Sequence, residues 1–493
     1  MQASPADSAT LPPQQSQPDK QGRAGDSPRS HDGIPWWLWA LAGALFFAHM
    51  TLSLRIHERM LSNAFDLGIF EQVIRSYADG HLPVSEVKGP DFPVLGDHFH
   101  PVLALVAPFY RLWPSPQVLL VVQAALIAVS VLPLALWARR ALGSGAAAVI
   151  GTCYGLSWGL ANAAGFDFHE VAFAVPLLAC SLAALGSDRL RTAAFWAVPL
   201  VLVKEDLGLT VAVIGFLIAR RGERRLGIAT AAAGLVGTAL AMLVILPAFN
   251  PQGSYAYTHW LTTDTGSEGG GGSGLLDLLY KVTIGLITPE AKVTTLLFLL
   301  APTLFLALRS PLLWVALPTL VWRFASGLWT HWGTSYHYSI VLMPIVFAAF
   351  IDALVRRQSS GASLRRYLVG SAAITALLLP QFPLWQLAKP ETWRPDPRVA
   401  VAHKLMDRIP DGATVQASNQ LVPQLTDRTS VSLYGWGDSR PNPEWIMVDT
   451  EVPQQRKWPL SVGEERISLD RALTQGYRTA AEQDGFVLLT RSG

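Results

Sequence analysis

The stretch PQVLLVVQAALIAVSVLPLALWA (residues 116–138) decides the fold class, because it runs for a full membrane thickness without a charged side chain. A helix needs about 20 apolar residues to span the hydrocarbon core of a bilayer. Arg139 and Arg140 follow directly, which is typical of a helix that leaves the bilayer on its cytoplasmic side. The stretch therefore predicts a transmembrane helix.

The composition of the whole chain agrees with a membrane protein. Hydrophobic residues make up 51% of the 493 residues and charged residues only 15%, against about 25% charged in an average soluble protein. This balance excludes one soluble globular domain. Two cysteines are too few for a disulfide scaffold, and the net charge of +2 gives no indication of a nucleic-acid partner.

Further apolar stretches predict an all-α polytopic membrane protein with about eleven transmembrane helices. One pair of short stretches is interrupted by Lys204, Glu205 and Asp206, so it is either two broken helices that meet at a polar turn or one kinked helix. The apolar stretch 98–113 contains two prolines and is interpreted as an interfacial or re-entrant segment. The expected spans are 35–54, 116–138, 144–164, 169–186, 192–205, 206–220, 225–248, 292–308, 310–327, 338–355 and 367–387.

Arginines mark one side of the predicted bundle. They gather in alternate connections between the spans, and the positive-inside rule places these connections in the cytoplasm. With eleven spans, the N-terminus is then cytoplasmic and the C-terminus extracytoplasmic. The arginines are Arg139, Arg140, Arg189, Arg191, Arg220, Arg221, Arg224, Arg225, Arg309, Arg356, Arg357, Arg365 and Arg366.

The two ends of the chain differ from the apolar middle. Residues 1–34 predict a disordered cytoplasmic tail. The transmembrane domain is expected over 35–387, with a large external loop at 55–115 and a flexible loop, EGGGGSG, at 268–274. Residues 388–493 regain ordinary polarity and predict a small extracytoplasmic α/β domain. Its expected elements are helices in 403–412 and 471–485 and strands at 413–418, 444–449 and 486–490.

Charged and imidazole side chains gather in the connections on the predicted external side. Such groups are costly at a membrane, so each is a functional candidate. The stretch NAFDLGIFEQVIRSYADG (63–80) is amphipathic and predicts a helix along the membrane surface. The candidates are Asp66, Asp97, His98, His100, Asp167, His169, Glu170, Lys204, Glu205, Asp206, Arg323, His331, Tyr336, His337 and Tyr338.

Structural roles are open alternatives for most of these groups. Glu71 and Glu86 are expected to be solvated surface acids. Arg323 could reach the lipid headgroups, the histidines of GDHFHP could pack at the interface, and the Lys-Glu-Asp turn could neutralise itself. The turn GFDFHE (165–170) is harder to explain in this way, because it places two acids and an imidazole between two apolar helices.

Six strings together resemble a family of predicted bacterial multi-pass membrane proteins known as domain of unknown function 2079. The resemblance covers about residues 36–450, and the strings are FDLGIFEQ, GDHFHPVLALVAPFYRLWPSP, FDFHEVAFAVPLL, VKEDLGL, YHYSIVLMP and IPDGATVQASNQLVPQLTDR. The layout of this family is similar to that of the GT-C glycosyltransferases, which take a sugar from a polyprenyl-phosphate donor. The resemblance therefore implies a GT-C-like fold in the plasma (inner) membrane of a bacterial cell.

The similarity to GT-C enzymes implies roles for individual residues. Their acid in the first external loop corresponds to Asp66, and a second acidic site, between spans three and four, corresponds to Asp167 and Glu170. The first loop departs from several GT-C families in having one acid rather than a pair. Asp66 and Asp167 are the predicted catalytic residues. The predicted ligands of the donor phosphate are Lys204, Arg323, His331, His337, His98 and His100, with Glu205 and Asp206 beside them.

A divalent metal is an open question, since GT-C enzymes differ in whether they bind one. An acid-rich turn repels itself unless a cation lies nearby, and carboxylates with one imidazole suit Mg²⁺ or Mn²⁺. Asp167, His169 and Glu170 are the candidate ligands, and the basic groups of neighbouring turns are the metal-free alternative. In both versions we expect these residues to meet Asp66 in one external pocket, with Lys204 or Arg323 on its lipid-facing wall.

Three functions remain open. The first is a GT-C-like glycosyltransferase that moves a sugar from a polyprenyl-phosphate donor in the membrane to an acceptor on the external face. The second is a transporter or flippase for a lipid or a sugar, because broken helices with a charged turn are also a transporter feature. The third is a non-catalytic envelope assembly protein whose external domain binds a partner. The sugar, the acceptor and the oligomeric state are left open.

Overall fold

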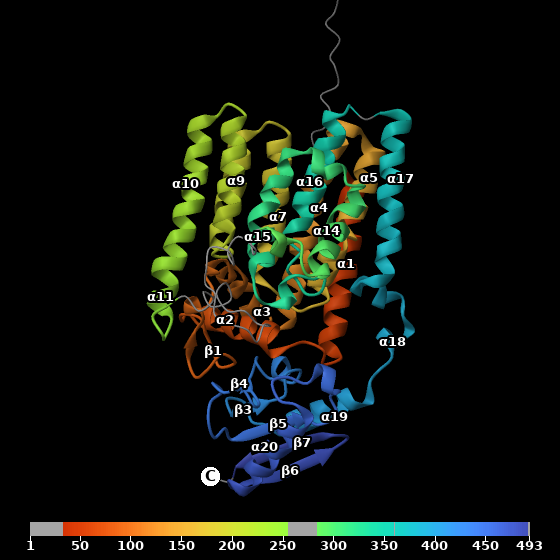
Figure 1. Cartoon of the computed structure of the whole chain (residues 1–493). Helices are drawn as coiled ribbons and strands as arrows, with labels where there is room; N and C mark the ends of the chain where they lie inside the picture. The colour runs from red at the N-terminus through yellow and green to blue at the C-terminus, as the bar shows by residue number, and fades with distance from the viewer. Residues whose placement is uncertain (1–32, 255–282, 359, 492–493) are drawn as a thin grey trace, which may run out of the picture. The chain divides into compact units, whose positions relative to one another are not determined.

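Apolar helices stand side by side in the larger part of the molecule, and a small sheet closes one end (Figure 1). The computed structural model describes residues 33–254, 283–358 and 360–491. Most of the predicted disordered tail at 1–34 and the predicted flexible loop at 268–274 lie outside the described residues.

Every predicted span contains a helix, but several of the helices are short or broken. Four helical segments are long and apolar enough to cross a membrane: Trp36–Glu58, Gln117–Leu142, Arg224–Phe249 and Gly361–Gln381. The count of eleven spans stays a prediction. The bundle consists of α1 (Trp36–Glu58), α4 (Gln117–Leu142), α5 (Ser144–Gly155), α6 (Trp158–Ala164), α7 (Ala174–Gly186), α8 (Leu190–Ala197), α9 (Leu207–Arg220), α10 (Arg224–Leu240), α11 (Leu246–Phe249), α14 (Glu290–Leu300), α15 (Leu317–Ala325), α16 (Leu342–Arg356) and α17 (Gly361–Leu378).

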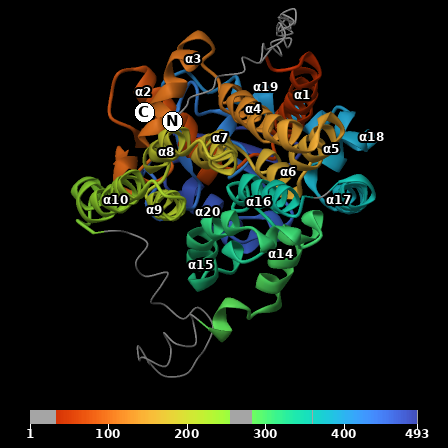
Figure 2. The ribbon, with the colours of Figure 1, turned by 90° about the horizontal axis from the view of Figure 1, so that it is seen from above.

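Small residues allow some of these helices to approach closely. A Cβ atom added to Gly208 of α9 would lie 2.3 Å from the carbonyl oxygen of Gly234 in α10. About two turns further along α9, Gly215 meets Gly227 of α10 in the same way. Close backbone contact through small residues is a common way for helices to associate in a membrane. Figure 2 shows α9 and α10 side by side at one edge of the bundle.

The predicted pair of short helices is two helical pieces that meet at a turn. The first piece is α8 with a 3₁₀ segment, Val198–Leu202, and the second is α9. The interruption lies at Lys204–Asp206, so the structure has broken helices rather than one kinked helix. The turn carries three ionisable side chains out of the apolar bundle.

The loop after α1 folds into short helices below the bundle. A π-helix (Ala64–Gly68) leads into α2 (Ile69–Ala78), followed by β1 (Val84–Ser85), β2 (Phe92–Pro93), a 3₁₀ segment (Pro101–Val106) and α3 (Ala107–Leu112). The expected helix at 63–80 is present, but it is largely buried rather than exposed along a surface. The reason is that the C-terminal sheet covers it.

The solvated roles expected for two acids are wrong. Glu71 of α2 is fully buried and bonds to the hydroxyl of Tyr110, and burial raises the pKa of Glu71 to about 7. Glu86 is 8% exposed and accepts two hydrogen bonds of 2.8 Å from the guanidinium of Arg440. Both acids are therefore part of the contact between the loop and the sheet.

The C-terminal sheet has the strand order β4-β3-β5-β7-β6. Strands β3 (Thr414–Ala417), β4 (Ser430–Leu433) and β5 (Trp445–Asp449) are parallel, and β6 (Tyr477–Gln483) and β7 (Phe486–Arg491) form an antiparallel hairpin. Helices α18 (Pro390–Trp393), α19 (Pro397–Met406) and α20 (Val462–Thr474) complete this part.

One predicted helix in this part is wrong. The stretch 471–485 is helical only up to Thr474 and continues as strand β6. Gly476 ends the helix with a φ of 96°, and Asp484 and Gly485 both have positive φ in the turn to β7. An Asp-Gly pair with positive φ at both residues forms a tight hairpin, so β7 brings 477–483 into the sheet.

The sheet and the helices share one apolar core. Leu67 and Phe70 of the loop pack in the same buried cluster as Val422, Val431 and Met447 of the C-terminal part. Hydrogen bonds also cross this contact, for example from Gln72 Nε2 to the carbonyl oxygen of Val431 at 2.9 Å. The predicted domain boundary at residue 388 stays a prediction.

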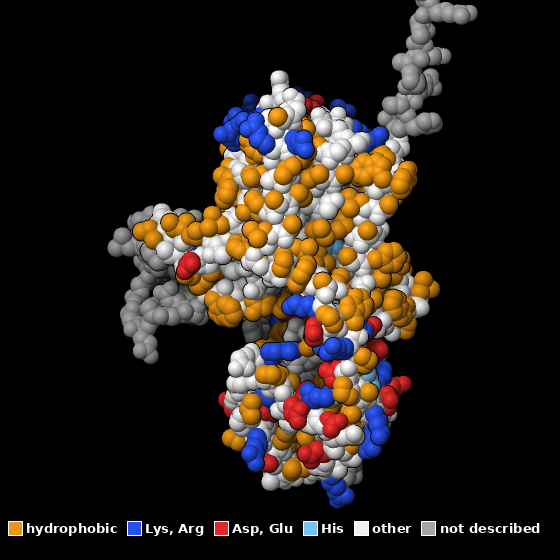
Figure 3. Space-filling view, turned by 90° about the vertical axis from the view of Figure 1, so that its right-hand side faces the viewer, with side chains coloured by type: hydrophobic (Ala, Val, Ile, Leu, Met, Phe, Trp, Pro, Cys, Tyr) orange, Lys and Arg blue, Asp and Glu red, His pale blue; other side chains and the backbone are white. Residues whose placement is uncertain are grey.

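The two ends of the bundle differ in charge. In Figure 3 apolar side chains cover the middle of the molecule, Lys and Arg gather at one end, and mixed charges cover the sheet at the other end. The arginine-bearing turns α4–α5, α9–α10 and α16–α17 lie at the end away from the sheet (Figure 1).

Candidate functional site

A cavity of about 290 Å³ lies where the helical bundle meets the loop after α1. Its walls come from that loop, the turn before α7, the turn before α9 and the loop after α15. These are the connections from which the sequence predicted site residues. The candidates that line the cavity are Asp66, Asp97, His98, His100, His169, Glu170, Lys204, Glu205, Asp206, His331, His337 and Tyr338.

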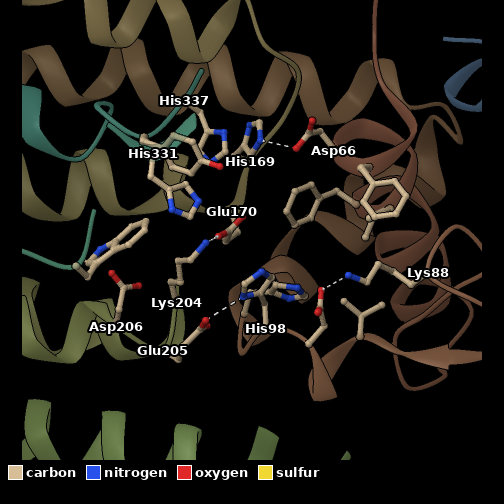
Figure 4. Close-up of a pocket in the computed structure, with 18 of the residues that line it drawn as sticks. Asp66, Lys88, His98, His169, Glu170, Lys204, Glu205, Asp206, His331 and His337 are labelled. Carbon is tan, nitrogen blue, oxygen red and sulfur yellow. Dashed lines mark hydrogen bonds and ion pairs between the residues drawn. The ribbon is translucent and has the colours of Figure 1, made fainter. Parts of the chain in front are cut away.

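Asp66 enters the cavity from the π-helix Ala64–Gly68. Single π-helical turns are rare and often lie at functional sites. The Oδ1 atom of Asp66 is 2.9 Å from Nε2 of His169, and the Asp66 side chain stays 21% exposed whereas that of His169 is 3% exposed. Figure 4 shows this pair on one wall of the cavity. The carboxylate is thus oriented by an imidazole and still accessible.

Lys204 and Glu170 form an ion pair on the neighbouring wall. The distance from Lys204 Nζ to Glu170 Oε1 is 2.7 Å. Burial alone would lower the pKa of Lys204, but Glu170, Glu205 and Asp206 around it raise that pKa. Lys204 is therefore a fixed positive charge in the cavity, and a lysine ammonium has three N–H donors, so further donors remain for a ligand.

The other two acids of the turn before α9 differ in charge state. Glu205 Oε1 lies 2.9 Å from His98 Nδ1, and Glu205 Oε2 accepts the backbone N–H of Phe99 at 3.1 Å. Burial opposes ionisation, but His98 and Lys204 outweigh it and lower the pKa of Glu205 to about 2. For Asp206, burial dominates and raises the pKa to about 6. Glu205 is thus a structural anion, whereas Asp206 titrates near neutral pH.

The predicted histidine ligands are neutral imidazoles near neutral pH. Burial lowers the pKa of His100 to about 4 and that of His331 to about 3. Burial and the neighbouring His169 lower the pKa of His337 as well, and its ring stacks on His169 with a centroid distance of 3.4 Å. Each of these neutral imidazoles can donate one N–H hydrogen bond to a bound ligand, but it adds no positive charge to the cavity. His98 is the exception, because Glu205 raises its pKa against the effect of burial.

Two predicted site residues lie behind the wall of the cavity. Asp167 is 2% exposed, and its Oδ2 accepts hydrogen bonds from the backbone N–H and the side-chain amide of Asn63 at 2.8 and 2.9 Å. Arg323 is fully buried and donates to the carbonyl oxygens of His331 and Gly333 and to the hydroxyl of Ser339. Among the described residues the cavity wall includes neither of them.

The three predicted metal ligands have separate partners. Asp167 bonds to Asn63, His169 faces Asp66, and Glu170 faces Lys204. The described part of the chain contains no group of three or more His, Cys, Asp or Glu side chains that could hold a metal ion. These residues do not fit a shared ligand set, and the Lys204–Glu170 pair corresponds to the metal-free version of the predicted pocket.

Lys88 is a cavity residue that the sequence did not single out. Its Nζ lies 3.1 Å from Asp97 Oδ2 and 5.5 Å from the centre of the Phe65 ring. Figure 4 shows Lys88 on the side of the cavity opposite Lys204. Lys88 is the one lysine of the loop 55–115, and it belongs to no motif whose spacing would indicate a binding site. Its place in the predicted external loop was the one signal in the sequence.

The fold and the site together define a class of protein. Crystal structures of ArnT from Cupriavidus metallidurans are similar to this chain. The structure bound to undecaprenyl phosphate has a TM-score of 0.54 at 14% identity, and the match covers 93% of this chain and 98% of that one. The apo structure has a TM-score of 0.49 at 14% identity, covering 92% and 97%. The chain is thus a helical membrane protein with the GT-C fold.

The family follows from the sequence match. The model of the family described as "Predicted membrane protein (DUF2079)" matches residues 56–488. The chain belongs to this family, as its sequence strings predicted. No curated protein matches the sequence.

Proposed function

We propose that this protein is a glycosyltransferase that moves a sugar from a polyprenyl-phosphate donor to an acceptor hydroxyl. The observation that carries the proposal is a cavity at one end of an apolar helical bundle, lined by both an accessible carboxylate, Asp66, and a fixed cation, Lys204. A donor with an apolar tail and a polar head needs such a boundary. The similar fold of ArnT, which has been crystallised with undecaprenyl phosphate, supports this donor class.

In the proposed reaction the acceptor oxygen attacks the anomeric carbon of the donor sugar. The bond between that carbon and the phosphate oxygen breaks, and the polyprenyl phosphate leaves with the bonding electrons. Asp66 accepts the proton of the acceptor hydroxyl, and the imidazole of His169 orients the carboxylate. General base catalysis of this kind contributes about 10²–10⁴-fold to a rate.

Positive charge for the leaving phosphate comes from the protein in this proposal. Lys204 and Lys88 enter the cavity from opposite sides, and each forms an ion pair with an acid, Glu170 and Asp97 respectively (Figure 4). Charge-assisted hydrogen bonds to a phosphate are stronger than neutral ones, and stabilisation of developing charge is a large part of catalysis. No step of this proposal depends on the Mg²⁺ or Mn²⁺ that the sequence left as an open question.

The reaction is proposed for the extracytoplasmic face of the bacterial plasma membrane. The arginine-bearing turns lie at the end of the bundle away from the cavity and the sheet, and arginine-rich connections favour the cytoplasm. In this orientation the C-terminal part, 388–493, is extracytoplasmic and the N-terminus cytoplasmic. A membrane-impermeant thiol reagent should then label a cysteine placed in 388–493 but not one in 356–366.

The test is transfer by purified full-length protein in lipid nanodiscs. The donors are polyprenyl phosphates that carry a labelled hexose, pentose or N-acetylhexosamine, offered with a membrane glycolipid extract as acceptor. We expect label in the acceptor fraction, reduced about 10²–10⁴-fold in Asp66→Asn. Asp79→Asn is the matched control, because it changes an exposed acid of the same loop. Equal transfer by the Asp66 and Asp79 variants would refute the proposed role, and movement of labelled donor across the bilayer without transfer would favour the transporter.

A further inference from the structure

A second, narrow cleft lies at the carboxyl ends of the parallel strands of the C-terminal sheet. The chain passes from β3 to β4 on one side and then back to β5 on the other side of β3. In open α/β sheets, ligands bind in the crevice at such a change of direction, outside the carboxyl ends of the strands. Here Ser418, which follows β3, and Asp449, which ends β5, both line the cleft, and the backbone N–H of Asp449 donates to Ser418 Oγ at 3.0 Å.

The lining of this cleft combines one exposed aromatic ring, Trp458, and one buried one, Tyr434, with planar polar side chains. Trp458 is 42% exposed at its rim, and Gln420 and Arg456 lie beside it. Within the described residues, the side chains of Gln420 and Arg456 have no hydrogen-bond or ion-pair partner. By contrast, the two acids of the cleft are already paired, Asp449 with Arg398 and Glu465 with Lys457.

We infer that this cleft binds a sugar unit of the acceptor; the inference rests on the proposed transferase function. A sugar ring has an apolar face of C–H groups, which suits an exposed indole, and an edge of hydroxyl groups, which suits amide and guanidinium side chains. The cleft has a volume of only about 10 Å³, about the space of one water molecule. The ring therefore lies on Trp458, and a hydroxyl group enters the cleft towards Gln420.

The cleft is directly connected to the π-helix that carries Asp66. The Trp458 ring packs edge-on against the Phe65 ring with a centroid distance of 4.8 Å. From the same loop as Gln420, Asn419 Oδ1 accepts the backbone N–H of Ala64 at 2.9 Å, and Asn419 Nδ2 donates to Asn63 Oδ1 at 3.0 Å. A sugar held on Trp458 therefore lies beside Phe65, which directly precedes the proposed base Asp66.

The sheet is also held firmly against the cavity on this side. Trp436 packs against both Phe65 and Trp458, at 5.0 and 5.5 Å between ring centroids. The loop that follows Trp436 carries Arg440, whose guanidinium binds Glu86 with two hydrogen bonds of 2.8 Å. Lys88, two residues beyond Glu86, lines the cavity. The three packed rings of Phe65, Trp436 and Trp458 are therefore continuous with the cavity wall through Phe65.

The experiment measures binding apart from turnover. Full-length Asp66→Asn protein in nanodiscs is titrated by calorimetry with cellotriose, maltotriose, chitotriose and α-mannotriose at millimolar concentration. We expect at least one of them to bind, with affinity about tenfold lower after Trp458→Ala or Gln420→Leu, a change of about 1.4 kcal/mol, and partly restored in Trp458→Phe. Trp393→Ala, which removes another exposed tryptophan, is the matched control.

The outcomes separate this inference from the proposed function. If none of the four trisaccharides binds, or if Trp458→Ala binds as well as Trp393→Ala, the sugar site is refuted. Transfer activity with an unchanged acceptor KM in Trp458→Ala would also refute the site and would leave the transferase intact. Sugar binding that depends on Trp458 in a protein without transfer would support the site while refuting the transferase.

Discussion

The carboxylate of Asp66 and the imidazole of His169 meet at 2.9 Å although they lie 103 positions apart in the chain. One comes from the first long loop and the other from the turn before α7. The edge of the His169 ring contacts Asp66 through Nε2, and one face of the ring stacks on His337, so the ring has little freedom to turn away. This geometry makes His169 the residue that sets the direction of the Asp66 carboxylate.

The first prediction concerns this pair. His169→Ala removes the hydrogen bond but leaves the Asp66 carboxylate in place. A lost hydrogen bond of this kind is worth about 1.5 kcal/mol, so kcat should fall about tenfold, much less than in Asp66→Asn. His169→Gln, which keeps a side-chain N–H, should recover part of the loss. Steady-state transfer kinetics check the order of the three variants, and a larger loss in His169→Ala than in Asp66→Asn would contradict it.

The second prediction separates the charge of Lys204 from its structural role. Lys204→Met leaves Glu170, which is 2% exposed, without its partner, and breaking a buried pair costs about 3–5 kcal/mol. The double variant Lys204→Met with Glu170→Gln should recover most of the thermal stability but not the donor affinity. Thermal unfolding in detergent and the donor KM measure the two effects. Recovery of both by the double variant would exclude Lys204 as a phosphate ligand.

The third prediction follows from Asp206. Burial raises the pKa of Asp206 from the ordinary 3.8 to about 6. The folded protein then holds this proton more tightly than the unfolded chain. The contribution of Asp206 to stability is therefore largest at low pH, falls as the pH rises from about 4 to 6, and stays low above that range.

Asp206→Asn removes this dependence. Compared with the wild type, the Asn variant should gain thermal stability at about pH 8 and gain less at about pH 5. Asp79→Asn, at an exposed position, should show no such difference. Unfolding midpoints across this pH range decide the matter, and an equal shift of the Asp206 variant at both pH values would disprove the role of burial.

The fourth prediction concerns the metal. Because Asp167, His169 and Glu170 have separate partners in the protein, we expect EDTA treatment followed by metal-free buffer to leave transfer and the unfolding midpoint unchanged. A loss of transfer that Mn²⁺ or Mg²⁺ restores would show instead that a divalent cation binds elsewhere or rearranges these pairs. Metal analysis of the purified protein before treatment is the control.

The sequence predicted which polar side chains lie together where topology alone decides which loops meet. Polar groups in alternate connections come to the same end of a helical bundle, and this brought Asp66, His169, Glu170 and Lys204 into one cavity. Long apolar runs such as that of α4 also located the helices, because a helix satisfies its own backbone hydrogen bonds in lipid.

The sequence predicted secondary structure and burial less well where contacts between residues far apart in the chain determine them. Strand β6 depends on pairing with β7, and its residues alone have the polarity of a surface helix. The burial of Glu71 and Glu86 depends on the sheet, which comes more than 300 residues later in the chain. Asp167 lies in the expected turn, but which of its neighbours faces the cavity depends on how that turn packs on Asn63.

The last prediction concerns Arg323, which the sequence suggested as a phosphate ligand. In the structure its guanidinium is buried and holds the loop 326–339, from which His331 and His337 reach the cavity. A lysine keeps the charge but offers no planar fork, so Arg323→Lys leaves buried carbonyl groups unpaired, at about 1–3 kcal/mol each. We therefore expect Arg323→Lys to lower the thermal unfolding midpoint, and the folded fraction to keep a nearly normal donor KM. Arg366→Lys, at an exposed position, should change neither quantity. A donor KM raised more than about tenfold at an unchanged midpoint, a difference of over 1.4 kcal/mol in donor affinity, would return Arg323 to the phosphate site and overturn its assignment as a support of the loop.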